Sequence, residues 1–308
     1  MGERVFVSGP TGAVGVALIN CLINYGYEVT ALCRRNSLRI SQIPVCDQVK
    51  IIECDLSELE GLSEKELGNG KYFFHLAWEG TNGKDRENAE IQLKNVQYTV
   101  DSIDLASRLG CEKFIGAGSQ AEYGITNEKL SSETRVNPVS AYGAGKLSAF
   151  FLGKIRAEQL RMKFNWVRIL SVYGPNDGCH TLIMSAIEKM STGKEIELTA
   201  GTQKWDYLYC DDAARGLYLV AEKGKNQKAY VLGSGNSAPL KQFILTMEEV
   251  IPTHSKLLWG RIPYTGNSVM YLCADSREIY QDTGFEPIIS FREGIRKTWQ
   301  WYKENRGI

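Results

Sequence analysis

The residues best suited to chemistry are a serine, a tyrosine and a lysine near the middle of the chain. Ser119 follows the small residues 116–118, and Tyr142 lies four positions before Lys146. On a helix, residues at that spacing share one face. A lysine ammonium beside a phenol favours the phenolate, so it lowers a pKa that is otherwise about 10. We expect Tyr142 to exchange a proton with a carbinol or ketone whose oxygen Ser119 also binds, at a site that moves hydride to or from a sugar-type carbon.

The alternative is that this tyrosine and lysine belong to a solvated helix face, which is the usual meaning of so short a motif. Tyr142 is, however, the only one of the 15 tyrosines with a lysine at the fourth following position. It also lies behind a start of the chain that is typical of nucleotide binding. Together these features favour the catalytic interpretation.

That start consists of an apolar run, a glycine-rich turn and a helical pattern. Residues 5–7 predict a buried strand, and Gly9, Gly12 and Gly15 follow at three-residue spacing before apolar residues recur with helical period up to position 26. Glycines at such a turn let the backbone approach a pyrophosphate, which the helix N-terminus attracts. We therefore favour dinucleotide binding over an ordinary tight turn.

The residues after the second predicted strand bear on the choice of cofactor. An NAD site usually has an acid there for the ribose 2′-hydroxyl, whereas residues 28–33 are followed by Arg34 and Arg35. Two guanidiniums can bind a 2′-phosphate bidentately, which favours NADP(H) over NAD(H). The alternative is that both arginines are a solvated strand end.

Strand and helix patterns alternate along the chain and predict an α/β fold, a Rossmann-type doubly wound parallel sheet with a smaller mixed C-terminal substrate-binding lobe. Further strands are expected at 49–56, 71–78, 113–118, 165–170, 204–212 and 229–233, and helices at 85–109, 141–163, 180–192, 240–250, 275–282 and 290–305. Asp211 or Asp212 is expected to cap the helix that follows them. His75 is expected to be a satisfied core histidine. The pattern changes after Pro175, so we assign 1–174 with 204–232 to the nucleotide-binding domain, and 175–203 with 233–308 to the lobe.

Composition excludes several classes of partner. Lys plus Arg and Asp plus Glu both number 36, which gives no reason to expect nucleic acid or a membrane surface, and no apolar stretch is long enough to span a bilayer. The eight cysteines form no Cys-x-x-Cys pair, which is typical of free thiols in a reducing cytoplasm. Three widely spaced histidines predict no metal site.

These motifs together resemble the extended short-chain dehydrogenase/reductase superfamily, in the branch that acts on nucleotide-diphosphate sugars. The resemblance spans nearly the whole chain and is carried by Gly9, Gly12, Gly15, Asp55-Leu56, His75-Leu76-Ala77, Asn95, Ser119, Tyr123-Gly124, Tyr142, Lys146, Arg168, residues 172–175, 207–212 and 270–275. It implies cofactor contacts from Gly9, Thr11, Gly12, Ala13, Val14, Arg34, Arg35, Asp55, Leu56, Leu76, Ala77, Asn95, Tyr142, Lys146, Ile169 and Val172. It implies substrate contacts from Trp78, Gln120, Ser171, His180, Trp205 and Arg261.

Within that branch the residues after Ser119 discriminate between reactions. Sugar 4,6-dehydratases have an acidic pair or a lone glutamate in the next two positions, where this chain has Gln120 and Ala121. The epimerase/reductase that makes GDP-fucose has a cysteine in place of Ala121, with a partner histidine that corresponds to His180. The resemblance therefore leaves simple chemistry at C4, either net reduction of a 4-keto sugar or a 4-epimerisation.

The two arginines favour reduction, because a reductase draws on NADPH while an epimerase keeps and recycles NAD. We expect an NADPH-dependent 4-ketoreductase of a nucleotide-linked 4-keto-6-deoxy sugar, for surface polysaccharide or glycan precursors. The alternatives are an NAD-dependent 4-epimerase and, in another class, a non-catalytic NADP(H)-sensing regulator or scaffold. Lys204 or Arg261 replaces an expected phosphate-binding arginine before Asp206, and Trp205 either stacks on a ring of the substrate or packs the lobe. A homodimer built on helices at 90–109 and 141–163 is implied by the resemblance.

Overall fold

The protein is built on one seven-stranded parallel sheet. The computed structural model describes residues 2–266 and 268–307. The strands lie in the order β11-β6-β5-β4-β1-β2-β3, so the order reverses between β1 and β4. Their bounds are β1 Arg4–Ser8, β2 Glu28–Cys33, β3 Val49–Glu53, β4 Tyr72–His75, β5 Lys113–Ser119, β6 Lys163–Ile169 and β11 Lys228–Leu232.

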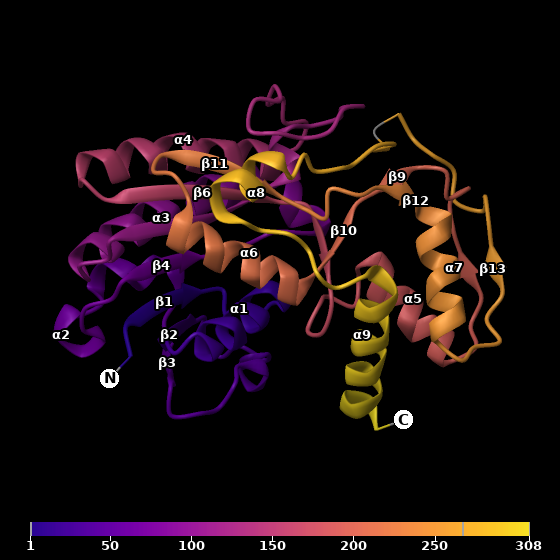
Figure 1. Cartoon of the computed structure of the whole chain (residues 1–308), viewed down its shortest axis with the longest axis horizontal. Coiled ribbons are helices and arrows are strands. Elements are labelled where there is room, and N and C mark those ends of the chain that lie inside the picture. The colour runs from indigo at the N-terminus through magenta and orange to yellow at the C-terminus, as the bar shows by residue number, and fades with distance from the viewer. Residues whose placement is uncertain (1, 267, 308) are drawn as a thin grey trace.

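Helices cover both faces of this sheet, which makes the fold doubly wound (Figure 1). On one face α1 (Ala13–Asn24) packs beside α6 (Cys210–Lys223), and on the other α3 (Ala89–Arg108) packs beside α4 (Ala141–Gln159). Short helices lie in the connections: η1 Ile40–Gln42, η2 Leu56–Gly61, α2 Glu64–Leu67, η3 Gly83–Glu87 and η4 Gln120–Glu122.

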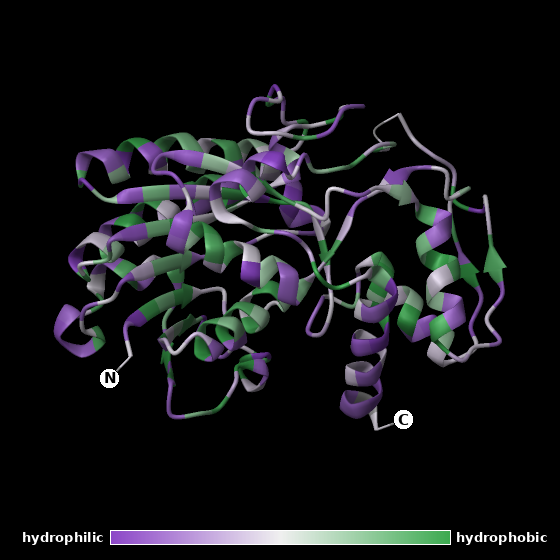
Figure 2. Ribbon diagram, in the orientation of Figure 1, coloured by the Kyte–Doolittle hydropathy of each residue, from purple (hydrophilic) through white to green (hydrophobic). Residues whose placement is uncertain are grey.

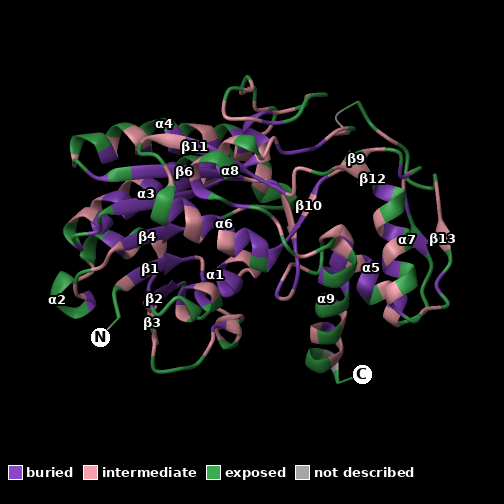
Figure 3. Ribbon diagram, viewed as in Figure 1, coloured by how far each residue is buried: buried purple, intermediate pink, exposed green. Residues whose placement is uncertain are grey.

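The strands are apolar along their length because both faces of the sheet are covered. All seven residues of β5 are buried, as are all four of β4. Hydrophobic residues follow the central strands in Figure 2, and the same strands are buried in Figure 3 while the outer faces of the helices are exposed. Two separate hydrophobic clusters result, one on each face of the sheet.

The remaining elements form a lobe beside the carboxyl edge of the sheet (Figure 1). It contains α5 (Leu182–Ser191), α7 (Leu240–Val250), α9 (Phe291–Arg306) and three two-stranded sheets, which pair β7 (Ser171–Tyr173) with β10 (Tyr207–Tyr209), β9 (Lys204–Trp205) with β12 (Ala238–Pro239), and β8 (Ile196–Glu197) with β13 (Leu257–Leu258). The hydrophobic cluster under α1 and α6 continues into the lobe through Met190, Ile244 and Ile295. The lobe therefore shares its core with the sheet.

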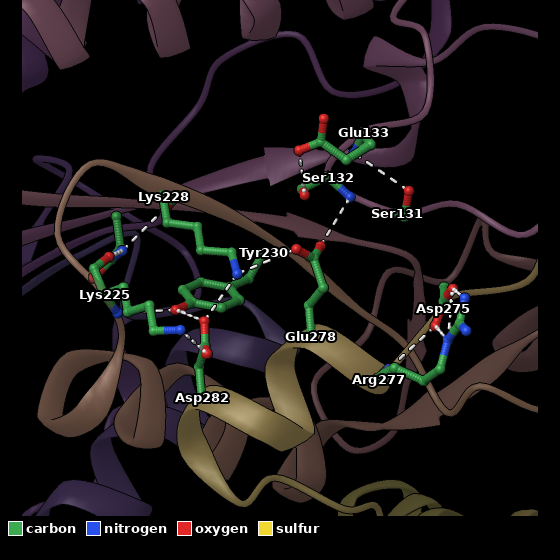
Figure 4. Close-up of polar contacts among 11 residues, drawn as sticks. Ser131, Ser132, Glu133, Lys225, Lys228, Tyr230, Asp275, Arg277, Glu278 and Asp282 are labelled. Carbon is green, nitrogen blue, oxygen red and sulfur yellow. Dashed lines mark hydrogen bonds and ion pairs between the residues drawn. The ribbon is translucent and has the colours of Figure 1, made fainter.

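A short helix, α8 (Arg277–Thr283), fastens the late part of the chain to the edge strand β11. Lys228 of β11 forms ion pairs with Asp282 at 2.9 Å and with Glu278 at 3.1 Å, and the Tyr230 hydroxyl donates to Asp282 at 2.8 Å (Figure 4). Burial alone would raise the pKa of Asp282, but hydrogen bonds from Lys225, Lys228 and Tyr230 outweigh it and lower that pKa to about 2. This network fixes the sheet edge against the tail.

Several expected boundaries are corrected by the structure. The helix expected at 85–109 is divided into η3 and α3, and the helix expected to run from 141 to 163 ends at Gln159. Neither Asp211 nor Asp212 caps α6, because the helix begins at Cys210 and both aspartates lie in its first turn. The Asp212 carboxylate instead accepts the backbone N–H groups of Ile288 and Ile289.

Candidate active site

The candidate site lies where the strand order reverses, at the carboxyl ends of β1 and β4, which is where open α/β sheets bind ligands. Gly9 follows β1 with a φ of +73°, and a Cβ at this position would lie 2.6 Å from the backbone nitrogen of Ala77 after β4. Only glycine fits so close an approach of two backbones. A cavity of about 630 Å³ opens beside this turn.

The wall of the cavity includes some of the residues predicted to bind the cofactor. Gly9, Thr11, Arg34, Leu56 and Ala77 line it. Gly12 precedes α1 without any side-chain cap, so the first N–H groups of that helix are free to bind an anion. These features fit the pyrophosphate of a dinucleotide. Other predicted contacts lie outside the lining: Ala13 and Val14 in α1, Leu76 after β4, Ile169 at the end of β6 and Val172 in β7.

The two arginines after β2 are in different environments. Arg34 lines the cavity, whereas the Arg35 guanidinium forms an exposed ion pair with Glu58 at 2.9 Å. Asp55 accepts the backbone N–H of Arg35 at 3.3 Å and is the N-cap residue of η2. The second cation at this end of the cavity is Arg39, which sequence reasoning missed and which donates to the backbone oxygen of Asn176.

The segment after β4 is held by two buried amides of α3. The Gln92 side chain accepts from Trp78 Nε1 at 2.7 Å and donates to the backbone oxygens of Gly80 and Asp85, both at 3.0 Å. Asn95 binds the backbone of Glu79 with both ends of its amide, at 2.9 Å each. Asn95 therefore shapes the cavity wall from behind, and its amide is engaged by the protein itself.

Ser119, Tyr142 and Lys146 come together as the sequence predicts. Ser119 ends β5, and Tyr142 and Lys146 lie on the first two turns of α4, whose N-cap Ser140 accepts from Gly143. The Lys146 ammonium is buried, donates to the Ala117 oxygen at 2.6 Å and lies 5.9 Å from the centre of the Tyr142 ring. Lys146 also lies over the Trp78 ring at 3.7 Å, and that ring meets Tyr142 edge-on.

The charges in this site differ from the sequence-based expectation. Burial lowers the pKa of Lys146 to about 7, although the negative charge of Glu122 acts against this. Burial raises the pKa of Tyr142, and the groups that oppose the rise are the Ser119 hydroxyl and the Arg86 guanidinium. The expectation that Lys146 sets a lowered Tyr142 pKa is therefore wrong for this structure, because desolvation dominates and the nearest cation on the phenol is Arg86.

Glu122 forms a buried polar network directly behind Ser119. Its Oε1 accepts from the Ser119 backbone N–H and from Trp166 Nε1, both at 2.9 Å, and its Oε2 accepts from Arg168 Nε at 2.7 Å. Both Glu122 and Arg168 are almost fully buried. This paired charge fixes the turn that presents Ser119 and was not recognised from the sequence.

The predicted substrate residues of the lobe are more scattered. Trp205 Nε1 donates to the Ser171 hydroxyl at 2.7 Å, and the exposed His180 ring is 3.1 Å from the amide of Asn82, which lines the cavity. Trp78 lines the cavity, Gln120 lies half-buried in η4 after Ser119, and Arg261 is exposed on the lobe.

Among the residues that the structure describes, one histidine lies in the core. His75 is the core histidine that the sequence predicts, since it is buried against the hydroxyls of Ser8, Thr99 and Ser102. No cluster of histidine, cysteine and acidic side chains in this part of the chain could hold a metal ion. Across residues 2–266 and 268–307, we find no helix with the length and apolar character that crossing a membrane requires.

Comparison with known proteins decides the family. The model of the NAD dependent epimerase/dehydratase family matches residues 5–233. The chain belongs to this family. It is an enzyme of the extended short-chain dehydrogenase/reductase type, whose relatives are nucleotide-sugar epimerases, dehydratases and synthases.

The relatives of this chain are named for different reactions. A UDP-glucuronate 4-epimerase of Thermodesulfobacterium geofontis is 25% identical, over 97% of this chain and 96% of its own. A CDP-abequose synthase of Salmonella muenchen is also 25% identical, over 96% of this chain and 97% of its own. The structure of a UDP-glucuronic acid 4-epimerase from Bacillus cereus in complex with UDP-glucuronic acid and NAD has a TM-score of 0.86 at 21% identity, covering 98% of this chain and 100% of that one.

Proposed function

We propose that this protein uses NADPH to reduce the C4 ketone of a nucleotide-diphosphate 4-keto-6-deoxy sugar, as a step toward surface polysaccharide or glycan precursors. The observation that carries the proposal is the state of the Glu122 carboxylate behind Ser119. Glu122 is buried and bonded to Ser119, Trp166 and Arg168, and the two positions after Ser119 are Gln120 and Ala121. Because elimination of water needs an available acid or base, this arrangement favours simple proton transfer at C4.

The cofactor preference rests on the end of the cavity beside β2. The lining there consists of Leu32, Arg34, Ser37, Leu38 and Arg39, with no acid among these described residues. Arg34 and Arg39 would hold a 2′-phosphate, and Gly9 with the N-terminus of α1 would hold the pyrophosphate. When bound, NADPH supplies the hydride.

The protein's own residues then carry out the proton transfer. Tyr142 donates its phenolic proton to the ketone oxygen, and the Ser119 hydroxyl orients that oxygen by hydrogen bonding. Lys146 is fixed between Ala117 and Trp78, from which it holds positive charge beside the reacting groups. The burial that lowers the Lys146 pKa excludes water from the same place.

The nucleotide-sugar class of substrate is supported by the relatives. The UDP-glucuronic acid 4-epimerase of similar fold binds a nucleotide sugar, and the CDP-abequose synthase is named for a CDP-linked product. Trp78 and Asn82 line the cavity, and Asn82 contacts the His180 ring. We place the sugar between them and Tyr142.

The first test is the cofactor state of the purified protein. Denaturation and analysis of the released nucleotide, followed by titration with NADPH and NADH, should show preference for NADPH. A panel of CDP-, dTDP-, UDP- and GDP-linked 4-keto-6-deoxy sugars should then reveal net NADPH oxidation with one of them. Arg34→Ala should weaken NADPH more than NADH binding, whereas Arg35→Ala should not.

An NAD-dependent 4-epimerase is the second candidate, and the named 4-epimerase relatives favour it. It predicts tightly held NAD and interconversion of C4 isomers without net cofactor oxidation. A protein that binds NADP(H) but turns over no member of the panel in either assay would instead be a regulator or scaffold.

A homodimer is proposed from one apolar helical surface. Leu93 on α3 and Phe151, Leu152 and Ile155 on α4 are 50–68% exposed. Burying this surface against a second copy would remove it from water. Sedimentation should give a dimer for the natural protein and a monomer for Phe151→Glu, while Leu245→Glu on α7 serves as the control.

A further inference from the structure

One arginine contacts the candidate catalytic tyrosine from outside the predicted site. The guanidinium carbon of Arg86, in η3, lies 4.1 Å from the centre of the Tyr142 ring. Burial raises the pKa of this phenol, and the positive charge of Arg86 opposes the rise. The guanidinium also donates a hydrogen bond to the Thr81 backbone oxygen at 2.9 Å. Cation–π attraction thus acts on Tyr142 from this side.

The positive charge of Arg86 is not neutralised by a carboxylate among the described residues. Its guanidinium donates to the neutral Thr81 backbone oxygen and lies over the neutral Tyr142 ring. Of the acids that flank it, Glu87 accepts the backbone N–H of Ala141, and Asp85 uses its backbone oxygen to bind Gln92. An unpaired cation next to a buried phenol has its main electrostatic effect on that phenol.

The segment that carries Arg86 is fixed, in contrast to most surface arginines. Gln92, which is 2% exposed, binds the backbone at Gly80 and at Asp85, so it anchors the segment immediately before Arg86. The same amide binds Trp78, whose ring meets Tyr142 edge-on. One buried side chain therefore sets both Arg86 and Trp78 against the tyrosine.

We propose that Arg86 is a further catalytic residue, which stabilises the negative charge that develops on the Tyr142 oxygen during proton transfer. In the reduction, the O–H bond of Tyr142 breaks, its proton bonds to the ketone oxygen, and the electron pair remains on the phenolate. This inference rests on the proposed function for its role in turnover, but the contact itself acts on Tyr142 whether or not a sugar is present.

Other groups also face Tyr142 and have to be separated from Arg86 in a test. They are the Ser119 hydroxyl at the end of β5, the Glu122 carboxylate in η4 and the Lys146 ammonium on the same helix. Glu122 acts in the opposite direction to Arg86, because its negative charge disfavours the phenolate. A variant of Arg86 leaves all three in place.

The experiment measures ionisation of Tyr142 directly. Phenolate absorbance is titrated against pH in pairs of proteins with and without Tyr142→Phe, so that the difference reports this tyrosine alone. The pairs are made in the natural chain, in Arg86→Gln, in Arg86→Lys and in Lys84→Gln, which removes an exposed cation of the same short helix. Titration needs no substrate, so its result stands independently of the proposed reaction.

We expect Arg86→Gln to move the half-ionisation of Tyr142 to higher pH, and Arg86→Lys and Lys84→Gln to stay near the natural protein. Where a 4-keto sugar is reduced, Arg86→Gln should lower turnover about ten- to a hundredfold, because the positive charge beside the developing phenolate is lost. Added guanidinium should partly restore turnover of Arg86→Ala. Unchanged ionisation of Tyr142 in Arg86→Gln, or an equal shift in Lys84→Gln, would overturn the inference.

Discussion

The carboxyl edge of the sheet and the C-terminal lobe hold their candidate residues in different ways. At the sheet edge, Ser119 and Lys146 are buried, and Glu122, Arg168 and Gln92 support them with hydrogen bonds that are themselves buried. In the lobe, His180 and Arg261 are exposed on connecting segments. Parallel strands buried on both faces fix a side chain far more firmly than short two-stranded pairs do.

We propose that the sheet edge and the lobe have different roles in the active site. The sheet edge would hold the groups proposed to transfer the proton, a step that tolerates little displacement of the reacting groups. The lobe would select the nucleotide and the sugar, a role for which loops can vary without disturbing the core. Substitutions at the sheet edge should therefore affect turnover or stability strongly, and substitutions in the lobe should affect them weakly.

The largest effect is expected at Tyr142. Replacing it by phenylalanine removes the proton donor and should lower turnover about 10²- to 10⁴-fold, because this is the usual contribution of general acid catalysis. Cofactor affinity should change little, which fluorescence titration with NADPH would check. Near-normal turnover of Tyr142→Phe would show that Tyr142, and with it the sheet edge, does not supply the proton.

A second test concerns the support behind Ser119. Arg168→Met leaves the Glu122 carboxylate buried without its partner at 2.7 Å, and this should cost about 3–5 kcal/mol in free energy of unfolding. Urea unfolding measures that free energy. Adding Glu122→Gln should recover part of the loss; a single variant as stable as the natural protein would show that the network does not hold the site.

The pH dependence of stability tests the core of the same region. Burial lowers the pKa of His75 from 6.5 to about 3, so the folded state binds fewer protons than the unfolded state between these values. The stabilisation from neutral His75 is complete above about pH 6.5 and is lost as the pH falls toward 3, by up to about 5 kcal/mol. His75→Gln should lack this dependence when unfolding free energies at neutral and acidic pH are compared.

Much of the sheet edge could be predicted from the sequence, because the patterns that specify it involve residues close together in the chain. Apolar runs gave the strands to within a few residues, and the four-residue spacing placed Tyr142 and Lys146 on one helix face. The supporting contacts join residues far apart in the chain, such as Glu122 with Arg168. Nothing in the local pattern of Arg86 or Arg39 indicated where a folded neighbour would lie.

Contacts between residues far apart in the chain were even harder to predict in the lobe. Asp212 looked like a helix cap, yet its carboxylate binds the backbone at Ile288 and Ile289, more than seventy residues later in the chain. Trp205 was predicted either to stack on substrate or to pack the lobe, and its indole N–H bonds to Ser171. Such partners depend on how the tail folds back over the sheet.

The glycine-rich turn gives a smaller and more selective effect. A Cβ at Gly12 meets no atom within 4 Å, while one at Gly15 would lie 2.2 Å from the Gly9 oxygen. Gly12→Ala should therefore keep the protein's stability but weaken NADPH binding about tenfold or more, because the methyl group occupies the approach of the pyrophosphate. Gly15→Ala should lower stability by about 1–3 kcal/mol. Calorimetric titration and thermal unfolding of both variants would separate the two effects, and unchanged affinity of Gly12→Ala would contradict the assignment of this turn.

The smallest effect is expected in the lobe. Trp205→Phe keeps an aromatic ring but loses the 2.7 Å hydrogen bond to Ser171, which should cost about 1 kcal/mol of stability. Turnover should stay within a few-fold of the natural protein in steady-state kinetics. A loss comparable to that of Tyr142→Phe would place Trp205 among the reacting groups and erase the contrast between the two regions.

Net reduction at C4 can be tested with NADPH that carries a labelled hydride. The protein is mixed with a nucleotide-linked 4-keto-6-deoxy sugar and NADPH that carries deuterium at the transferable position, and product and cofactor are then quantified. We expect deuterium at C4 of a 4-hydroxy product, with NADP⁺ formed in equal amount. Interconversion of C4-epimeric nucleotide sugars by tightly bound NAD, with no net cofactor oxidation, would contradict it.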